Sequence, residues 1–227
     1  MTAVPASSAI PAGNVDRAAV LQATGITMAY RRGIWSLRHT NQVLTGADLT
    51  LYPGEVVGLV GENGSGKSTL MKILVGALAA DEGTVTRTGR LGYCPQEPLV
   101  YPRLTCDEHF DLFGHAYAMT RPATDVSRRA IYEALGFTRY ARTRADQLSG
   151  GTLAKLNLGL ALLADPDLLL LDEPYAGFDW DTYQKFWGLV AQRRRAGRTV
   201  LIVSHFLVDE DRFDRIVAVR DGIAAPR

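Results

Sequence analysis

The stretch VVGLVGENGSGKSTLMKILVGAL, residues 56–78, decides the fold of this chain. A continuous apolar run is followed by a glycine-rich turn. Apolar residues then recur at helical spacing, at Leu70, Ile73, Leu74, Ala77 and Leu78. This order predicts a buried strand, a loop and an amphipathic helix.

The loop matches the phosphate-binding pattern G-x-x-x-x-G-K-[ST] in full. In such a loop, backbone N–H groups close around phosphate oxygens at the positive end of a helix. Lys67 is expected to reach the β- and γ-phosphates, and the Ser68 hydroxyl to ligate Mg²⁺. The predicted ATP-binding residues of this P-loop are Gly61, Glu62, Asn63, Gly64, Ser65, Gly66, Lys67, Ser68 and Thr69.

Two further apolar runs, LLLLDE (168–173) and VLIVSH (200–205), predict parallel strands that are covered on both faces. Ligands of open α/β sheets gather beyond the carboxyl ends of such strands. Asp172 is therefore expected to hold Mg²⁺, and Glu173 to polarise the attacking water as a general base. Taken alone, the two acids could equally be a solvated strand end.

The remaining chain predicts an α/β core with additions. Apolar and polar residues alternate more in ITMAY (26–30) and VLTGADLTLYPGE (43–55), which favours an antiparallel β-layer before the loop. Residues 97–165 change to helical texture, with a capping box at Thr105 and Glu108 and a second helix from about Asp125 to Leu135. We expect an α/β fold: a P-loop NTPase core with an antiparallel β-layer and an all-helical subdomain.

Composition limits the class of protein. Lys and Arg number 25 and Asp and Glu 24 in 227 residues, so no nucleic-acid partner is expected, and RRRAGR (193–198) is interpreted as a solvated helix end. Cys94 and Cys106 are expected to be unpaired thiols. Residues 1–20 are predicted to be a disordered lead-in and 21–227 the domain. No run approaches the ~20 apolar residues that span a bilayer.

A second glycine turn, LSGGT (148–152), precedes another helical stretch. Ser149, Gly150 and Gly151 would stand at the N-terminus of that helix, where free N–H groups can hold an anion. Ser149 could also be only an N-cap, and the residues alone leave both interpretations open.

P-loop, LSGG, LLLLDE and a later histidine, in this order, resemble the nucleotide-binding subunit of ABC transporters, most closely those of two-component exporters. The resemblance runs from about residue 23 to 222. It implies a head-to-tail dimer with a second ATP-binding subunit, either an identical chain or a close paralogue. Ser149, Gly150, Gly151 and Asp179 would then serve the ATP held by the partner.

The resemblance also assigns single positions. Tyr30 matches the aromatic residue that stacks on adenine. Gln96 matches a glutamine that senses Mg²⁺ and water, and His205 the histidine that contacts the γ-phosphate; with Glu173 they form the expected catalytic set. The chain departs from the family pattern at Thr152, and at Tyr175 and Trp180 near the inter-subunit loop.

The function implied is ATP binding and hydrolysis with Mg²⁺ that powers transport, as export, through a separate integral membrane permease. Segment 97–105 is expected to receive that permease, which places the chain peripherally on the cytoplasmic face of the cell membrane. The alternative is a non-transport ABC-type ATPase that acts in translation or DNA repair. Such proteins usually carry two cassettes or a coiled-coil insertion, and this sequence has neither.

Overall fold

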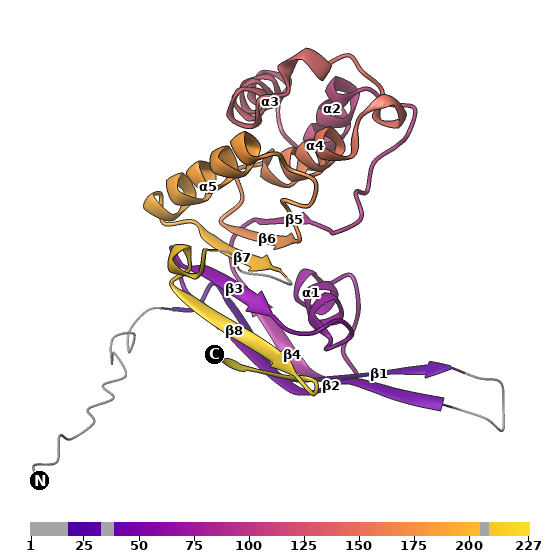
Figure 1. Cartoon of the computed structure of the whole chain (residues 1–227), viewed down its shortest axis with the longest axis vertical. Helices are drawn as coiled ribbons and strands as arrows, with labels where there is room; N and C mark the ends of the chain where they lie inside the picture. Colours follow the sequence, from indigo (N-terminus) through magenta and orange to yellow (C-terminus); the bar gives the residue numbers. More distant parts are fainter. Residues whose placement is uncertain (1–17, 33–38, 205–208) are drawn as a thin grey trace, which may run out of the picture.

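The computed structural model describes residues 18–32, 39–204 and 209–227 of the chain. Its strands form two sheets. The helices α2, α3 and α4 lie at one end of the molecule and the long β1–β2 pair at the other, with α1 between them (Figure 1). The predicted lead-in falls largely outside the described residues.

The larger sheet has six strands in the order β5-β6-β7-β3-β8-β9, and all neighbours except β8 and β9 are parallel. The three predicted parallel strands, β3, β6 and β7, are buried along their whole length, which confirms them. The strands are β3 (Val56–Val60), β5 (Leu91–Cys94), β6 (Leu168–Asp172), β7 (Thr199–Val203), β8 (Arg215–Arg220) and β9 (Ile223–Pro226).

Alternate residues of the central strands enter two different cores. Leu169 and Leu171 of β6 pack with residues of the helical end, whereas Leu168 and Leu170 pack with residues of α1 and of the smaller sheet. A strand with apolar contacts on both faces needs a continuous apolar run, which is why LLLL occurs here.

The predicted antiparallel β-layer is present as a second sheet in the order β2-β1-β4. Its strands are β1 (Leu21–Arg32), β2 (His39–Leu51) and β4 (Glu82–Arg87). Leu44, Leu49 and Leu51 of β2 are buried in the core that this sheet shares with α1. The sheet therefore covers one face of the larger one.

Helix α1 (Lys67–Val75) follows the P-loop, as predicted, but it is shorter. Leu70, Ile73 and Leu74 are buried as expected. Gly76 adopts a left-handed conformation and its N–H bonds to the carbonyl of Ile73, which ends the helix. The prediction that Ala77 continues the apolar face was wrong, because Ala77 lies beyond this end and is exposed.

Helices α2 (Cys106–Ala116), α3 (Arg121–Leu135) and α4 (Gly150–Leu162) lie between β5 and β6 in the chain, with the short 3-10 turns η1 (Thr138–Tyr140) and η2 (Ala145–Gln147). The capping box of α2 is confirmed: the Thr105 hydroxyl accepts from Glu108 N–H, and the Glu108 carboxylate accepts from Thr105 N–H at 2.7 Å. Helix α3 begins earlier than predicted because Thr120 caps it and proline occupies its first turn.

Helix α5 (Trp180–Arg195) ends in the arginine run, and a third 3-10 turn, η3 (Glu210–Arg212), precedes β8. The interpretation of this run as a solvated end was wrong for Arg193, whose side chain is only 10 % exposed and pairs with Asp165. Arg198 pairs with the same carboxylate and Arg194 with Asp214. Three arginines therefore hold the end of α5 against neighbouring segments.

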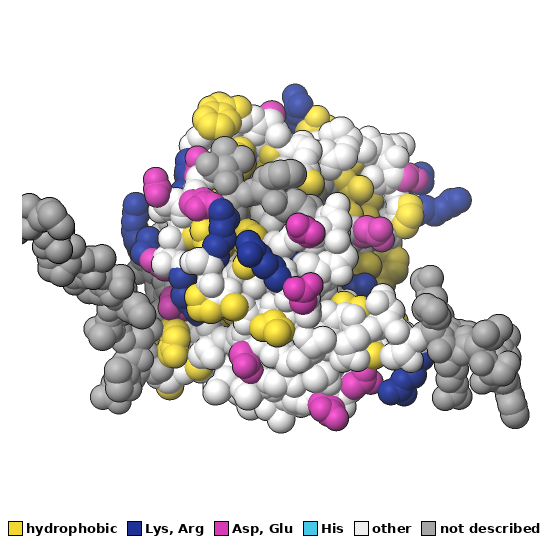
Figure 2. All heavy atoms as spheres, turned by 60° about the horizontal axis from the view of Figure 1, so that its bottom comes forward, with side chains coloured by type: hydrophobic (Ala, Val, Ile, Leu, Met, Phe, Trp, Pro, Cys, Tyr) yellow, Lys and Arg dark blue, Asp and Glu magenta, His cyan; other side chains and the backbone are white. Residues whose placement is uncertain are grey.

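Charges of both signs are interspersed on the face shown in Figure 2, with short groups of Lys and Arg bordered by Asp and Glu. Cys94 and Cys106 are both free thiols, as predicted. Among the residues that the structure describes, no helix combines the length and the apolar character needed to cross a bilayer.

Candidate nucleotide site

The P-loop runs from the end of β3 into α1, and its shape depends on glycine. Gly66 has φ 104°, and a Cβ atom there would lie 2.8 Å from the carbonyl oxygen of Val43 on β2. Only a residue without a side chain fits both the conformation and the close approach. The second glycine of the motif thus packs the loop against the antiparallel sheet.

The Lys67 side chain is hydrogen-bonded to the backbone of the loop. Its ammonium donates hydrogen bonds to the carbonyl oxygens of Gly61 at 2.7 Å and Glu62 at 2.8 Å. The residue is only 4 % exposed, and burial lowers the pKa of Lys67, an effect that Glu173 and Asp172 oppose. The charge of Lys67 is thus held next to the loop backbone, where the charges of both acids act on it.

The loop also has unused hydrogen-bonding groups. The first turn of α1 leaves N–H groups without helical partners, since the first bond of the helix is Leu70 N–H to Gly66 O. The Ser65 hydroxyl is buried and has no hydrogen-bond partner among the described residues. An anion with several oxygens, such as a polyphosphate, fits a cradle of this kind.

The two predicted acids stand at the carboxyl end of β6. Asp172 is 4 % exposed and pairs in register with Val203 of β7. Glu173 follows with φ 51°, a left-handed conformation that is rare for residues other than glycine, and its N–H bonds to the carbonyl of Val203 at 3.0 Å. Such a conformation turns the chain sharply at the strand end. Backbone strain of this kind clusters at functional sites.

The side chains near the loop also suit a magnesium ion. Ser68 is exposed on the first turn of α1, and Asp172 contributes to the field at Lys67 one residue earlier. A hydroxyl and a carboxylate are the hard oxygen donors that Mg²⁺ takes together with substrate phosphates and water. Both residues therefore fit the predicted metal site.

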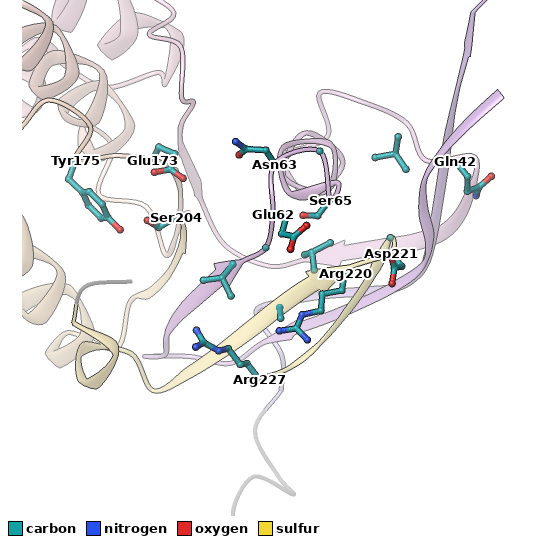
Figure 3. Close-up of a pocket in the computed structure, with 17 residues that line it drawn as sticks. Gln42, Glu62, Asn63, Ser65, Glu173, Tyr175, Ser204, Arg220, Asp221 and Arg227 are labelled. Carbon is teal, nitrogen blue, oxygen red and sulfur yellow. The ribbon is translucent and has the colours of Figure 1, made fainter. Parts of the chain in front are cut away.

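A cavity of about 1310 Å³ connects the loop to Glu173. Figure 3 shows Glu173, Tyr175 and Ser204 on one side of it and Glu62, Asn63 and Ser65 of the P-loop on the other. Its far wall consists of Gln42 and Val43 of β2 and of the β8–β9 turn with Arg220, Asp221 and Gly222. Sequence reasoning missed this wall, since its residues match no motif and come from distant parts of the chain.

Tyr30 reaches the same region from β1. Its hydroxyl lies 3.4 Å from the hydroxyl of Thr69, the last residue of the P-loop, and 40 % of the residue is exposed. The structure therefore places the predicted adenine-stacking residue beside the loop, with part of its surface open to a ligand.

The signature turn, residues 148–152, has a different environment. Ser149 caps α4 by accepting from Thr152 N–H at 3.3 Å, so the N-cap interpretation holds within the chain. A Cβ atom on Gly151 would lie 2.6 Å from the carbonyl oxygen of Gly177, which packs this turn against the loop before α5. Ser149 and Gly150 remain exposed.

Asp179 belongs to that loop and caps α5. Its carboxylate accepts from Thr182 N–H at 2.8 Å, and hydrogen bonds from Thr182 hold the pKa of Asp179 below its usual value. The predicted trans residues 149–151 and 179 thus lie on two loops that touch each other, and none of them lines the cavity.

Gln96 is exposed just beyond β5. The segment before it is attached to α4 by the buried Asn157, whose amide donates to the carbonyl of Pro95 at 2.7 Å and lies 3.2 Å from the Cys94 sulfur. Asn157 was also missed, although a single amide in the apolar helix LAKLNLGLALL was a signal for it. His205, the third predicted catalytic residue, lies outside the described residues.

The parallel sheet, the P-loop and the Asp–Glu pair define a P-loop nucleotide-binding domain. A family model described as ABC transporter matches residues 44–176. The chain therefore belongs to the ABC transporter family, as the sequence resemblance indicated, and carries its ATP-binding ATPase domain.

Among its relatives, the chain is 31% identical to the linearmycin resistance ATP-binding protein of Bacillus subtilis, over 89% of this chain and 67% of the relative. It is 32% identical to the Nod factor export ATP-binding protein I of Burkholderia lata, over 79% of this chain and 64% of the relative. The chain thus spans about two thirds of the length of these bacterial relatives.

Solved structures confirm the fold. A dimeric ATP-binding cassette in a post-hydrolysis state with ADP and Pi matches with a TM-score of 0.82 at 24% identity, over 91% of this chain and 97% of that one. A dimeric bacterial ABC transporter cassette matches with a TM-score of 0.79 at 26% identity, over 90% and 96% of the two chains.

Proposed function

We propose that this chain binds and hydrolyses ATP with Mg²⁺, dimerises when ATP binds, and powers export through a separate integral membrane permease. The observation that carries the proposal is a glycine-bounded cradle whose Ser65 hydroxyl has no partner among the described residues, across one cavity from Glu173.

Each group at this site has a chemical task. Lys67 and the N–H groups of α1 hold the β- and γ-phosphates and balance their charge. Glu173 accepts a proton from water as the water oxygen bonds to the γ-phosphorus and the bond from that phosphorus to the bridging oxygen breaks. Ser68, Asp172 and Gln96 would hold Mg²⁺, which would supply positive charge to the phosphates.

Dimerisation accounts for the second glycine turn. The signature turn and the loop of Asp179 pack together and expose Ser149 and Gly150, so they present one outward surface. In a head-to-tail dimer this surface meets the γ-phosphate on the partner, and hydrolysis weakens the contact by removing that phosphate. The dimeric state of the matching cassettes supports this arrangement.

The permease surface is proposed at segment 97–105, near the helical end. Leu99 is 68 % exposed and Tyr101 58 %, and a hollow of about 650 Å³ is lined by residues 101–104 and Leu112. The buried His109 holds this segment, since its ring accepts from Tyr101 N–H at 2.8 Å and bonds to the Thr105 carbonyl. An apolar surface on a fixed backbone suits an inserted helix of a partner.

The direction of transport rests on the relatives. One is named for resistance and another for export, and both are ATP-binding proteins. These names support an export role at the cytoplasmic face of the membrane rather than the alternative in translation or DNA repair.

The proposal is tested by isolating the chain from detergent-solubilised cells and measuring ATPase activity together with the co-purifying membrane protein. Leu99→Asp is expected to abolish stimulation by the partner and to leave ATP binding unchanged, because it places a charge on an exposed apolar surface. Val126→Asp, an equally exposed position on α3, is the matched control. Partner stimulation that survives Leu99→Asp contradicts the docking site.

A further inference from the structure

Tyr175 stands two residues after Glu173, and its ring is held by α5. The ring meets those of Tyr183 and Phe186 edge to face, with centroids 5.5 Å away in each pair. Two such contacts fix the direction in which the phenol points.

The phenol lies at the hydrolysis end of the cavity. Tyr175, Ser204 and Glu173 all line this cavity, and Figure 3 shows the Tyr175 hydroxyl directed toward Ser204 with Glu173 beside them. The Tyr175 hydroxyl is hydrogen-bonded to Ser204, and Ser204 N–H bonds to the carbonyl of Leu59 on β3. The phenol is thus attached to the central strands that lead to the P-loop.

The Tyr175 phenol stays protonated, and therefore neutral, at neutral pH. Burial raises the pKa of Tyr175 to about 12, and the nearby charge of Glu173 adds to that rise. The hydrogen bond to Ser204 opposes part of this rise. A neutral phenol therefore lines the same cavity as the Glu173 carboxylate, close enough to feel its charge.

Glu173 itself has a left-handed backbone conformation, which persists only where the surrounding structure holds it. The turn that follows is tied by hydrogen bonds from Ala176 N–H to the Glu173 carbonyl and from Phe178 N–H to the Tyr175 carbonyl. One short turn therefore presents the carboxylate and the phenol together.

We propose that Tyr175 is a positioning residue for ATP hydrolysis. Its phenol, fixed by α5 and by Ser204, holds the Glu173 carboxylate and the attacking water in line with the γ-phosphate. The inference rests on the proposed role of Glu173 as the base, and it adds a tyrosine that the family resemblance marked only as a departure.

The test is Tyr175→Phe, which removes the hydroxyl and keeps the ring contacts. Positioning groups around a reactive centre contribute about 10-fold or more to activity, so kcat should fall about 10-fold while KM for ATP stays unchanged. Tyr183→Phe is the matched control, because it makes the same change in a ring whose hydroxyl bonds to Asp209 and does not line the cavity. It should keep wild-type kcat.

A double-mutant cycle separates positioning from packing. If Tyr175 acts through Ser204, then Ser204→Ala lowers kcat as well, and the double variant is no slower than the slower single variant. Independent losses that multiply would overturn the inference, as would a Tyr175→Phe protein whose kcat is normal or whose KM alone rises.

Glu173→Gln, measured in parallel, distinguishes this inference from the proposed function. If Glu173→Gln is inactive and Tyr175→Phe is normal, the base assignment stands and only the role of Tyr175 is wrong. If Glu173→Gln turns over ATP normally, the proposed function of the site fails, and the inference fails with it.

Discussion

The P-loop and the signature turn are both glycine turns that open a helix, yet the hydrogen-bonding groups of the two turns have different partners. In the P-loop, Ser65 has a buried hydroxyl without a partner among the described residues, and the Lys67 ammonium donates hydrogen bonds to carbonyl oxygens of the loop. In the signature turn, Ser149 already caps its own helix, and Gly150 faces open space. The first turn keeps a buried hydroxyl unpaired among the described residues, whereas the second exposes its serine and its first glycine on the outer surface.

The largest expected effect is on the chemistry at the P-loop end. Glu173→Gln removes the proton acceptor but keeps the size of the side chain, so kcat should fall about 10²- to 10⁴-fold while ATP binding persists. The ATP-bound dimer should then accumulate, as measured by size-exclusion chromatography with light scattering. Glu133→Gln on the exposed face of α3 should change neither quantity. Near-normal turnover of Glu173→Gln would refute the base assignment.

The next effect is on binding alone. Lys67→Ala removes charge-assisted hydrogen bonds worth about 1.5–3 kcal/mol, so ATP affinity should fall roughly 10- to 100-fold. Titration calorimetry measures the change, and Lys72→Ala, an exposed lysine on the same helix, is the control. Equal affinities for the two variants would show that Lys67 does not bind phosphate.

The smallest expected effect is on the free energy of unfolding, when a glycine in each of the two turns is replaced by alanine. Gly66→Ala forces a side chain into a left-handed conformation and against the Val43 carbonyl, which should cost about 1–3 kcal/mol, or ~2–4 °C in Tm per kcal/mol. Gly150→Ala meets nothing within 4 Å, so the free energy of unfolding should change by at most about 0.5 kcal/mol. Equal decreases in Tm for the two variants, measured by thermal melts, would contradict the predicted difference between the two turns.

The sequence predicted those parts of the molecule whose signals are local. The three buried strands, the antiparallel layer and the capping box of Thr105 all follow from neighbouring residues, and the structure confirms them. The P-loop belongs here as well, because its nine residues directly follow the strand β3 and contain the turn and the helix start.

Features that join distant segments were not predictable in this way. Arg193 is largely buried and pairs with Asp165, and Asn157 donates to the carbonyl of Pro95, which follows β5 far away in the sequence. The prediction that Ala77 continues the apolar face of α1 was wrong because a single glycine, Gly76, ended the helix one residue earlier. The roles assigned to Gln96, Asp179 and His205, and the trans role of Ser149, came from resemblance alone and stay predictions.

The most direct measurement of the claim that the two turns serve two sites of one dimer uses Ser149→Asp. Aspartate caps a helix as well as serine, so the protomer should fold and bind ATP normally. Against the γ-phosphate of a partner, two negative charges ~4 Å apart repel by about 4 kcal/mol at an effective dielectric near 20, and dimerisation should collapse.

Mixing Ser149→Asp with Lys67→Ala protomers places both lesions in one composite site and leaves the other intact. The account predicts that each variant alone neither dimerises with ATP nor hydrolyses it, and that the mixture recovers ATP-dependent heterodimers with partial turnover. A Ser149→Asp protein that dimerises and turns over ATP at the wild-type rate by itself would contradict the trans site.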